Sequence, residues 1–142
     1  MIPTLGIIVP VLNEAENLAP FLKELESSLA EESWEVIFVD DESSDDTLQV
    51  VAALARKRGN VRLLERIGRH GLASACIEGM CSTLAPYLAV MDADLQHDPA
   101  ILSATLNALR DGPQNLTVKQ AFLTDASGSF AQARGFCYDH AQ

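Results

Sequence analysis

The chain has 142 residues, a formal net charge of −10 and a hydrophobic content of 48%. This length suffices for one domain with a real core and not for two. The negative charge argues against nucleic acid as a partner, because a phosphate backbone needs a surface rich in Lys and Arg. No run of about 18 apolar residues is present, so the sequence predicts no membrane-spanning helix.

Cysteine usage and the N-terminus indicate the cellular compartment. Cys76, Cys81 and Cys137 lack C-x-x-C spacing, and their odd number leaves at least one thiol unpaired. A reducing, cytoplasmic setting is therefore predicted. No basic region precedes the first apolar run, which contains Pro10, so no signal peptide is predicted.

Short apolar runs alternate with helical patterns from the first residues onward. Runs rich in β-branched residues predict buried strands, and apolar residues at helical spacing predict helices with one apolar face. The predicted strands are 5–10, 35–39, 61–64 and 87–92, and the predicted helices are 13–30, 45–58, 72–84 and 99–111. This alternation predicts an α/β fold with a mostly parallel sheet, right-handed crossovers and helices on both faces.

The predicted helices begin at recognisable capping residues. Asn13, with Glu16 three residues later, predicts a capping box at the first helix. Ser44 is the predicted N-cap of the second helix, and Pro99 occupies the favoured first position of the fourth. The inward face of the fourth helix is predicted to carry Ile101, Leu102, Thr105, Leu106 and Leu109.

The periodic signal weakens after Pro113. Residues 116–118 predict a fifth strand, whereas residues 124–142 mix Ser, Gly, Ala, Gln and aromatic residues without a clear period. We therefore divide the chain into a domain at 1–113 and a divergent tail at 114–142, with the tail irregular or partly disordered.

Polar side chains follow three of the apolar runs, at the point where each predicted strand ends. These segments are 10–14, 40–43 and 92–98. Because the carboxyl ends of parallel strands share one edge, where ligands bind in open α/β sheets, the segments are expected to form one pocket. Each acidic segment alone is also explained as a solvated loop, and the residues near Ser44 as a helix cap.

The last of these segments has the donors of a hard metal ion. Asp92 and Asp94 are one residue apart, and alternate side chains of a strand point the same way, so their carboxylates can converge. With the Gln96 carbonyl they suit Mg²⁺ or Mn²⁺. His97, in the same segment, is ambiguous, because a loop histidine that is hydrogen-bonded to backbone also explains it.

These motifs together resemble the N-terminal, nucleotide-binding half of GT-A (Rossmann-like) glycosyltransferases of family 2. Within that family the chain is similar to the polyprenyl-phosphate sugar transferases, the dolichol-phosphate mannose synthase group. The resemblance covers roughly residues 4–112 and is carried by the segments 7–18, 39–47, 69–75 and 91–99.

The resemblance implies a nucleoside diphosphate sugar, with GDP or UDP, as the donor. Asp40 or Asp41 would accept a hydrogen bond from the ring N–H of the base, which uracil and guanine both present. Arg69, with Arg66 as a weaker candidate, would contact the diphosphate, although a solvated cation is the alternative for either. The segment expected to pack on the base and ribose contains Pro10, Val11, Asn13 and Glu14.

Asp92 and Asp94 would be the catalytic residues, because the Mg²⁺ or Mn²⁺ that they hold with Gln96 would stabilise the leaving nucleoside diphosphate. The implied reaction transfers the sugar with inversion to a polyprenyl phosphate, as in cell-envelope glycan synthesis. Such an acceptor is already anionic, so no general base is needed. The implied location is cytoplasmic, at the cytoplasmic face of the membrane.

The chain departs from the family pattern in its last part. Ala121 stands where the family has an arginine, and the acceptor half is missing from the sequence. The alternatives are therefore an active donor domain or a truncated, non-catalytic module that binds a nucleotide sugar and a metal. The sheet edge left exposed would favour self-association. A remote alternative is a phosphoacceptor receiver domain. Residues 39–42 resemble the acid pair of such a domain, although a receiver carries that pair on its first strand.

Overall fold

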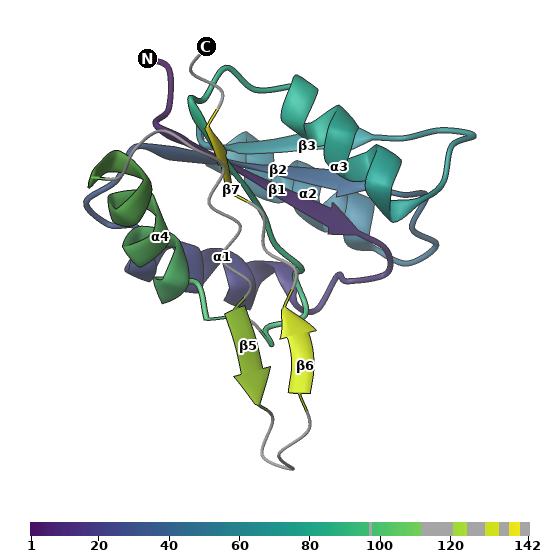
Figure 1. Cartoon of the computed structure of the whole chain (residues 1–142). Coiled ribbons are helices and arrows are strands. Elements are labelled where there is room, and N and C mark those ends of the chain that lie inside the picture. Colours follow the sequence, from purple (N-terminus) through teal and green to yellow (C-terminus); the bar gives the residue numbers. More distant parts are fainter. Residues whose placement is uncertain (97, 112–120, 125–129, 134–136, 140–142) are drawn as a thin grey trace.

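The computed structural model describes residues 1–96 and 98–111, together with the backbone of the strands at 121–124, 130–133 and 137–139. Four parallel strands form the centre of the sheet in the order β3-β2-β1-β4, and β7 joins β4 in antiparallel orientation (Figure 1). The strands are β1 (Leu5–Val11), β2 (Trp34–Asp40), β3 (Val61–Glu65), β4 (Tyr87–Val90) and β7 (Cys137–Asp139). The predicted α/β fold with a mostly parallel sheet is confirmed.

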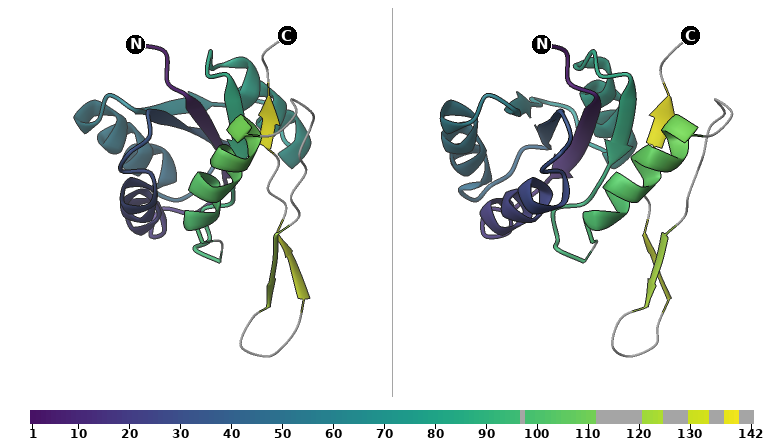
Figure 2. Two further views of the ribbon diagram at one scale, coloured as in Figure 1. Left: turned by 60° about the vertical axis from the view of Figure 1, so that its left-hand side comes forward. Right: turned by 90° about the vertical axis from the view of Figure 1, so that its left-hand side faces the viewer.

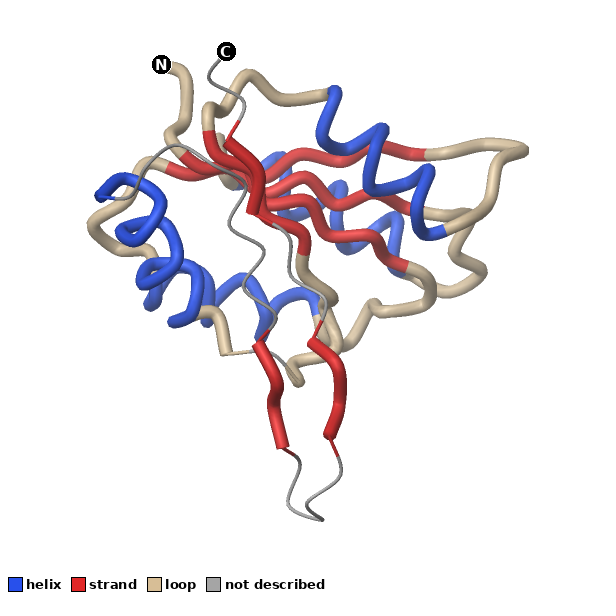
Figure 3. Tube along the Cα trace, viewed as in Figure 1, coloured by secondary structure: helices blue, strands red, loops and turns tan. Residues whose placement is uncertain are grey.

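Helices cover both faces of this sheet, as predicted. α1, α2 and α4 share a core on one face, whereas α3 packs on the other face against β1 and β2 (Figures 1 and 3). The helices are α1 (Leu18–Ser28), α2 (Thr47–Lys57), α3 (Leu72–Cys81) and α4 (Ala100–Asp111).

The central strands are apolar throughout because both of their faces are buried. In β1, Ile7 and Val9 face the core beneath α1, α2 and α4, whereas Ile8 faces α3. In β2, Phe38 and Val39 divide between the two cores in the same way. This alternation explains why the sequence shows continuous apolar runs rather than an apolar and polar pattern.

The start of α1 differs from the prediction. The helix begins at Leu18 and not at Asn13, and Asn17 stands at its N-cap without a side-chain capping bond. Asn13 has a φ of 57°, a left-handed conformation that a right-handed helix does not contain. The capping box predicted for Asn13 and Glu16 is therefore wrong.

The start of α2 is also shifted. Asp46, and not Ser44, occupies the N-cap position, and it makes no side-chain capping bond. The backbone N–H of Thr47 donates instead to Asp45 Oδ1 at 2.9 Å. The Ser44 cap is therefore wrong, because Ser44 is engaged by another loop, described below.

Two further boundaries and one burial prediction are corrected. α3 ends at Cys81 rather than at residue 84. At this end the N–H of Ser82 donates to the carbonyl of Gly79 at 3.1 Å. β4 ends at Val90, two residues before its predicted end. On α4, Ile101 is 38% exposed, whereas the other four residues predicted to face inward are buried.

The tail contains regular backbone where irregular chain is predicted. β5 (Ala121–Thr124) and β6 (Phe130–Ala133) pair as an antiparallel hairpin that projects away from the sheet (Figure 2). β6 and β7 lie within 124–142, so the irregular prediction is wrong for these two segments. The strand predicted at 116–118 and the helix end at Gly112 lie outside the described residues.

β7 pairs with Tyr87–Ala89 of β4, which covers that edge of the sheet along these residues. The division at residue 113 and the self-association through an exposed edge stay predictions. Within the described part of the chain, no helix has the length and apolar character needed to cross a membrane.

Candidate functional site

The three polar segments lie at one edge of the sheet, as predicted. The expectation that all three form one pocket is wrong for the described residues, because Leu95, Gln96 and Asp98 line a different pocket from Val11 and Asp41. β1 lies between β2 and β4, and all three run parallel. Val11 and Asp40 are register partners at the ends of β1 and β2. The N–H of Asp41 donates to the Val11 carbonyl at 3.0 Å, and that of Met91 to the Ile8 carbonyl at 3.0 Å. The parallel register therefore delivers these segments to the same edge.

A residue in left-handed conformation follows each of these strands. Asn13, Glu42 and Leu95 have φ values of 57°, 62° and 61°, and they are the non-glycine residues with positive φ in the described part of the chain. Such conformations are uncommon for residues with a Cβ and cluster at functional sites. Their location makes this edge the candidate functional edge.

Asn13 joins the end of β1 to the loop after β2. Its Oδ1 accepts hydrogen bonds from the backbone N–H of Ser44 at 2.8 Å and of Asp45 at 3.2 Å. Its own N–H donates to Ser43 Oγ at 3.0 Å. The side chain of Asn13 therefore holds a neighbouring loop, a role that the sequence reasoning missed.

Thr47 adds a second connection between the same two segments. It is fully buried, and its hydroxyl accepts a hydrogen bond from the Glu14 N–H at 2.9 Å. The same hydroxyl is hydrogen-bonded to the Asp45 carboxylate, which lowers the pKa of Asp45. The loops after β1 and β2 therefore form one hydrogen-bonded unit.

Asp40 and Asp41 have different environments. Asp40 is only 1% exposed; its Oδ2 accepts from the Ser43 N–H at 3.1 Å, and its Oδ1 is buried without a hydrogen-bond partner among the described residues. Asp41 is half-buried and lines a pocket of about 280 Å³. The other lining residues are Pro10, Val11, Leu12, Glu14, Leu72 and Ala75.

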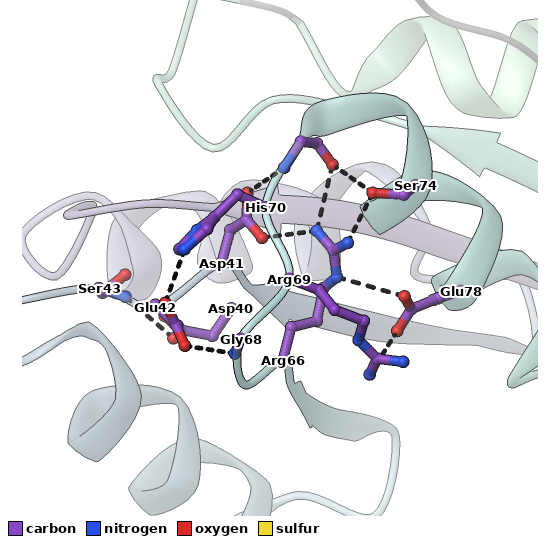
Figure 4. Close-up of polar contacts among 11 residues, drawn as sticks. Asp40, Asp41, Glu42, Ser43, Arg66, Gly68, Arg69, His70, Ser74 and Glu78 are labelled. Atoms are coloured by element: carbon purple, nitrogen blue, oxygen red, sulfur yellow. Dashed lines mark hydrogen bonds and ion pairs between the residues drawn. The ribbon is translucent and has the colours of Figure 1, made fainter.

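Arg66 contacts Asp41, a residue that lines this pocket, and is 1% exposed (Figure 4). Its guanidinium donates to Asp41 Oδ1 at 2.5 Å, to the Gly71 carbonyl at 3.1 Å and to Ser74 Oγ at 2.6 Å. Its Nε lies 3.4 Å from Glu78 Oε1, within ion-pair distance but without hydrogen-bond geometry. A solvated cation is therefore the wrong explanation for Arg66.

The loop before α3 is held by one further ion pair and by polar contacts of Glu42. Arg69, whose side chain is 61% exposed, lies 3.2 Å from Glu78 Oε2. His70 Nε2 lies 2.8 Å from Glu42 Oε2, and the Gly68 N–H donates to Glu42 Oε1 at 2.6 Å. These contacts attach the loop to the segment after β2 and leave Arg69 at the surface.

The proposed metal ligands lie on a loop rather than on a strand, since β4 ends at Val90. Asp92 and Gln96 are exposed and Asp94 is half-buried. The Gln96 N–H donates to Asp94 Oδ1 at 3.0 Å, and Leu95 makes the left-handed turn between them. The predicted convergence of Asp92 and Asp94 by strand alternation is therefore wrong, because both residues lie beyond the end of β4.

The donor set fits a hard cation that also binds a phosphate ligand. No group of three or more His, Cys, Asp or Glu side chains that could hold a metal occurs in residues 1–96 and 98–111. Mg²⁺ is commonly bound by one or two carboxylates, with substrate phosphates and water completing its octahedron. Asp92 and Asp94 are the candidates for the two carboxylates of such a site.

Cys76 on α3 lies within electrostatic reach of this loop. Burial raises the pKa of the Cys76 thiol, and the negative charge of Asp92 raises it further. α3 therefore flanks the acidic loop on one side and lines the pocket through Leu72 and Ala75. The sequence carried no signal for this proximity, because Cys76 reads there only as a packed helical residue.

A parallel α/β sheet with acidic loops at its carboxyl edge agrees with the GT-A fold that the sequence predicts. The model of glycosyl transferase family 2 matches residues 6–134, and the chain belongs to this family. The family resemblance identified in the sequence is confirmed, and it replaces the receiver-domain alternative.

Individual relatives agree with the family assignment. The chain is 36% identical over 119 residues to the dolichol-phosphate mannosyltransferase of Saccharomyces cerevisiae, covering 82% of this chain and 45% of that protein. The chain therefore spans less than half the length of this curated relative.

Solved structures show the same fold. The mannosyltransferase PcManGT from Pyrobaculum calidifontis, solved with GDP-Man and Mn²⁺, has a TM-score of 0.66 and 26% identity, over 78% of this chain and 33% of that one. Glucosyl-3-phosphoglycerate synthase from Mycobacterium tuberculosis, solved with Mn²⁺, UDP and phosphoglyceric acid, has a TM-score of 0.63 and 19% identity, over 78% and 40%. At 19% identity, the similarity to the synthase shows a shared fold and nothing more.

Proposed function

We propose that this chain binds the donor of a glycosyl transfer, a nucleoside diphosphate sugar, together with Mg²⁺ or Mn²⁺. The observation that carries the proposal is the common edge: the pocket lined by Asp41 and the loop of Asp92 and Asp94 both lie at the carboxyl ends of parallel strands. This is where ligands bind in open α/β sheets.

The pocket is assigned to the nucleoside. Pro10, Val11 and Glu14 line it and would pack on the base and ribose. Asp41, rather than Asp40, would accept the ring N–H of the base, because Asp40 is sealed from solvent. A carboxylate has about four acceptor positions, and protein donors occupy two of those of Asp41. Asn13 would act indirectly, by holding the loop after β2.

The acidic loop is assigned to the diphosphate and its cation. When bound, a divalent cation supplies Lewis-acid stabilisation of the leaving nucleoside diphosphate. Asp92 and Asp94 would hold it, with Gln96 assisting from the end of the same turn. Arg69 would contact the diphosphate, since its guanidinium stays largely exposed beside Glu78.

The proposed acceptor of the complete enzyme is a polyprenyl phosphate at the cytoplasmic face of a membrane, with inversion at the sugar. Support comes from the similarity to a dolichol-phosphate mannosyltransferase. Attack by an acceptor that is already anionic requires no general base. Solved relatives carry GDP-Man or UDP, so both bases remain candidates for this chain.

Calorimetric titration with GDP and UDP, with and without Mn²⁺, tests the donor site. We expect nucleotide binding that strengthens with Mn²⁺ and falls by about 10- to 100-fold in Asp92→Asn and Asp94→Asn. Asp111→Asn, at the exposed end of α4, is the matched control that removes the same charge elsewhere. Binding that is unaffected by both Mn²⁺ and Asp92→Asn would contradict the proposal.

A module that binds the nucleotide sugar and the metal without transferring the sugar is the second candidate. Transfer of mannose from GDP-Man to a polyprenyl phosphate, assayed with Mn²⁺, separates the two. Transfer supports the enzyme. Nucleotide binding without transfer, in an assay where a complete family member is active, supports the module.

A further inference from the structure

Arg66 is a charged side chain in a position where the chain elsewhere places apolar ones. It comes first by size among the side chains that are less than 2% exposed in the described residues. Its partners come from two elements: Asp41 follows β2, whereas Gly71, Ser74 and Glu78 belong to the start and middle of α3. Figure 4 shows the guanidinium between these two elements.

Stability alone does not account for such a residue. Removing a charge from water costs several kcal/mol per ion, and buried ion pairs are often no more stabilising than apolar residues of similar volume. What a buried guanidinium supplies is direction, because its planar fork fixes several partners at once. Arg66 fixes one carboxylate, one backbone carbonyl and one hydroxyl.

The fixed partners line the pocket themselves or precede a lining residue in the chain. Asp41 lines the pocket from the β2 side, and Leu72 and Ala75, next in sequence to Gly71 and Ser74, line it from the α3 side. Arg66 itself does not line the pocket. The N–H of Gly71 also donates to Asp41 Oδ2 at 3.0 Å. The orientation of the Asp41 carboxylate therefore depends on Arg66 and on the α3 start that Arg66 holds.

We infer that Arg66 is a positioning residue for base selection, which rests on the proposed function of the pocket. It orients the Asp41 carboxylate so that the remaining acceptor positions meet a ring N–H. Uracil and guanine present such a donor, whereas the corresponding ring nitrogen of cytosine is an acceptor. A site built around one hydrogen bond rejects a ligand that lacks the donor, because the buried acceptor is left unpaired.

Titrations of UDP, GDP and CDP against wild type, Arg66→Met and Arg66→Lys test this inference. We expect wild type to bind UDP or GDP more tightly than CDP. Arg66→Met is expected to reduce that preference by about tenfold or more, the equivalent of one misdirected charged hydrogen bond. Arg66→Lys keeps the positive charge but not the planar fork of donors. Its preference for UDP or GDP over CDP is therefore expected to lie between those of wild type and Arg66→Met. The strengthening by Mn²⁺ should persist in both variants.

Two controls separate positioning from folding. Arg62→Met removes an arginine of β3 that pairs with Glu35 and with the Ser82 carbonyl, so its base preference should match wild type. Ser74→Ala removes only one partner of the Arg66 guanidinium. Urea unfolding of every variant identifies any that are not folded. If Arg66→Met is not folded, Ser74→Ala replaces it in the test, with a smaller expected loss of the preference for UDP or GDP over CDP.

The outcomes are distinct. If wild type binds none of the three nucleotides, the proposed function fails and the inference fails with it. If wild type prefers UDP or GDP and the folded variants keep the full preference, or weaken all three nucleotides equally, the inference alone fails. If wild type binds CDP as tightly as UDP and GDP, the inference is also overturned, because Asp41 then does not select bases by accepting a ring N–H.

Discussion

Asn13 and Ser44 lie 31 residues apart in the chain and are joined by a hydrogen bond of 2.8 Å from the Ser44 N–H to Asn13 Oδ1. The same Oδ1 also accepts from the Ser44 hydroxyl and the Asp45 N–H. One amide oxygen thus organises the loop after β2 from the end of β1. The pocket lined by Glu14 and Asp41 is built across this connection.

Replacing Asn13 should therefore destabilise the protein in two separable ways. Asn13→Ala loses the acceptor and also places an alanine at a φ of 57°. We expect a loss of about 2–3 kcal/mol in the free energy of unfolding, from unmade hydrogen bonds and left-handed backbone. Asn13→Gly removes only the acceptor and should lose about 1 kcal/mol. Urea denaturation measures both, and equal stability of all three proteins would contradict the role assigned to Asn13.

Gly79 allows α3 to approach the sheet. A Cβ at this position would lie 2.5 Å from Ile8 Cγ2 and 3.0 Å from Val39 Cγ2. Alanine normally stabilises a helix relative to glycine by about 1 kcal/mol, but overpacking a core costs about 1–3 kcal/mol. Gly79→Ala is therefore expected to lower the stability by about 1 kcal/mol or more.

The control for this prediction is Gly59→Ala, where a Cβ meets nothing within 4 Å. Its stability should be equal to or slightly above that of wild type. Thermal unfolding of the two variants compares them directly. A stabilised Gly79→Ala protein would mean that α3 does not pack as closely as the structure has it.

The thiol of Cys76 reports on the acidic loop. Its pKa is raised first by burial and then by the negative charge of Asp92, since both disfavour the thiolate. Asp92→Asn should therefore lower this pKa, while burial keeps it above the ordinary value. In a background with Cys81 and Cys137 changed to serine, the alkylation rate against pH should shift to lower pH.

The matched control for the thiol measurement is Asp98→Asn, which removes a carboxylate from the same loop without being a source of the Cys76 shift. Its alkylation profile should stay at the position of the Cys76-only protein. If the Cys76-only protein and its Asp92→Asn variant gave identical alkylation profiles, Asp92 would not act on the Cys76 thiol.

Arg110 and Glu32 connect the end of α4 to the loop before β2. Two parallel hydrogen bonds of 2.8 Å join the guanidinium to both carboxylate oxygens, which raises the pKa of Arg110. Because the pair is partly exposed, a double-mutant cycle with Arg110→Ala and Glu32→Ala should give a coupling of about 0.5–1 kcal/mol. The coupling should shrink in high salt, and a salt-independent value would contradict a surface ion pair.

Local pattern was enough to predict the four parallel strands and the order of the elements from β1 to α4. β1 and β2 are continuous apolar runs because both faces of a parallel sheet are covered, and that signal is present in any short window of sequence. The family motifs likewise lie within short segments, so 7–18 and 39–47 were recognisable without the fold. The polar segments could be placed at one edge because parallel strands leave no other arrangement.

Boundaries at Asn13 and Ser44 could not be predicted in the same way. Both residues are good helix caps by type, but Asn13 Oδ1 and the Ser44 N–H bond to each other across two elements. Contacts between residues far apart in the chain outweigh local capping preferences here. The same holds for Ile101, whose helical spacing predicts burial although α4 leaves it 38% exposed.

The sequence alone therefore establishes the α/β order, the family and the position of the acidic segments after their strands, because these depend on residue type and short-range spacing. Only the tertiary structure separates Asp40 from Asp41, sealing the first and leaving the second at the pocket. It also turns Arg66 from a candidate surface cation into a buried connection between Asp41 and α3. Burial and charge pairing arise from which elements pack together, and that information lies in no single stretch of the chain.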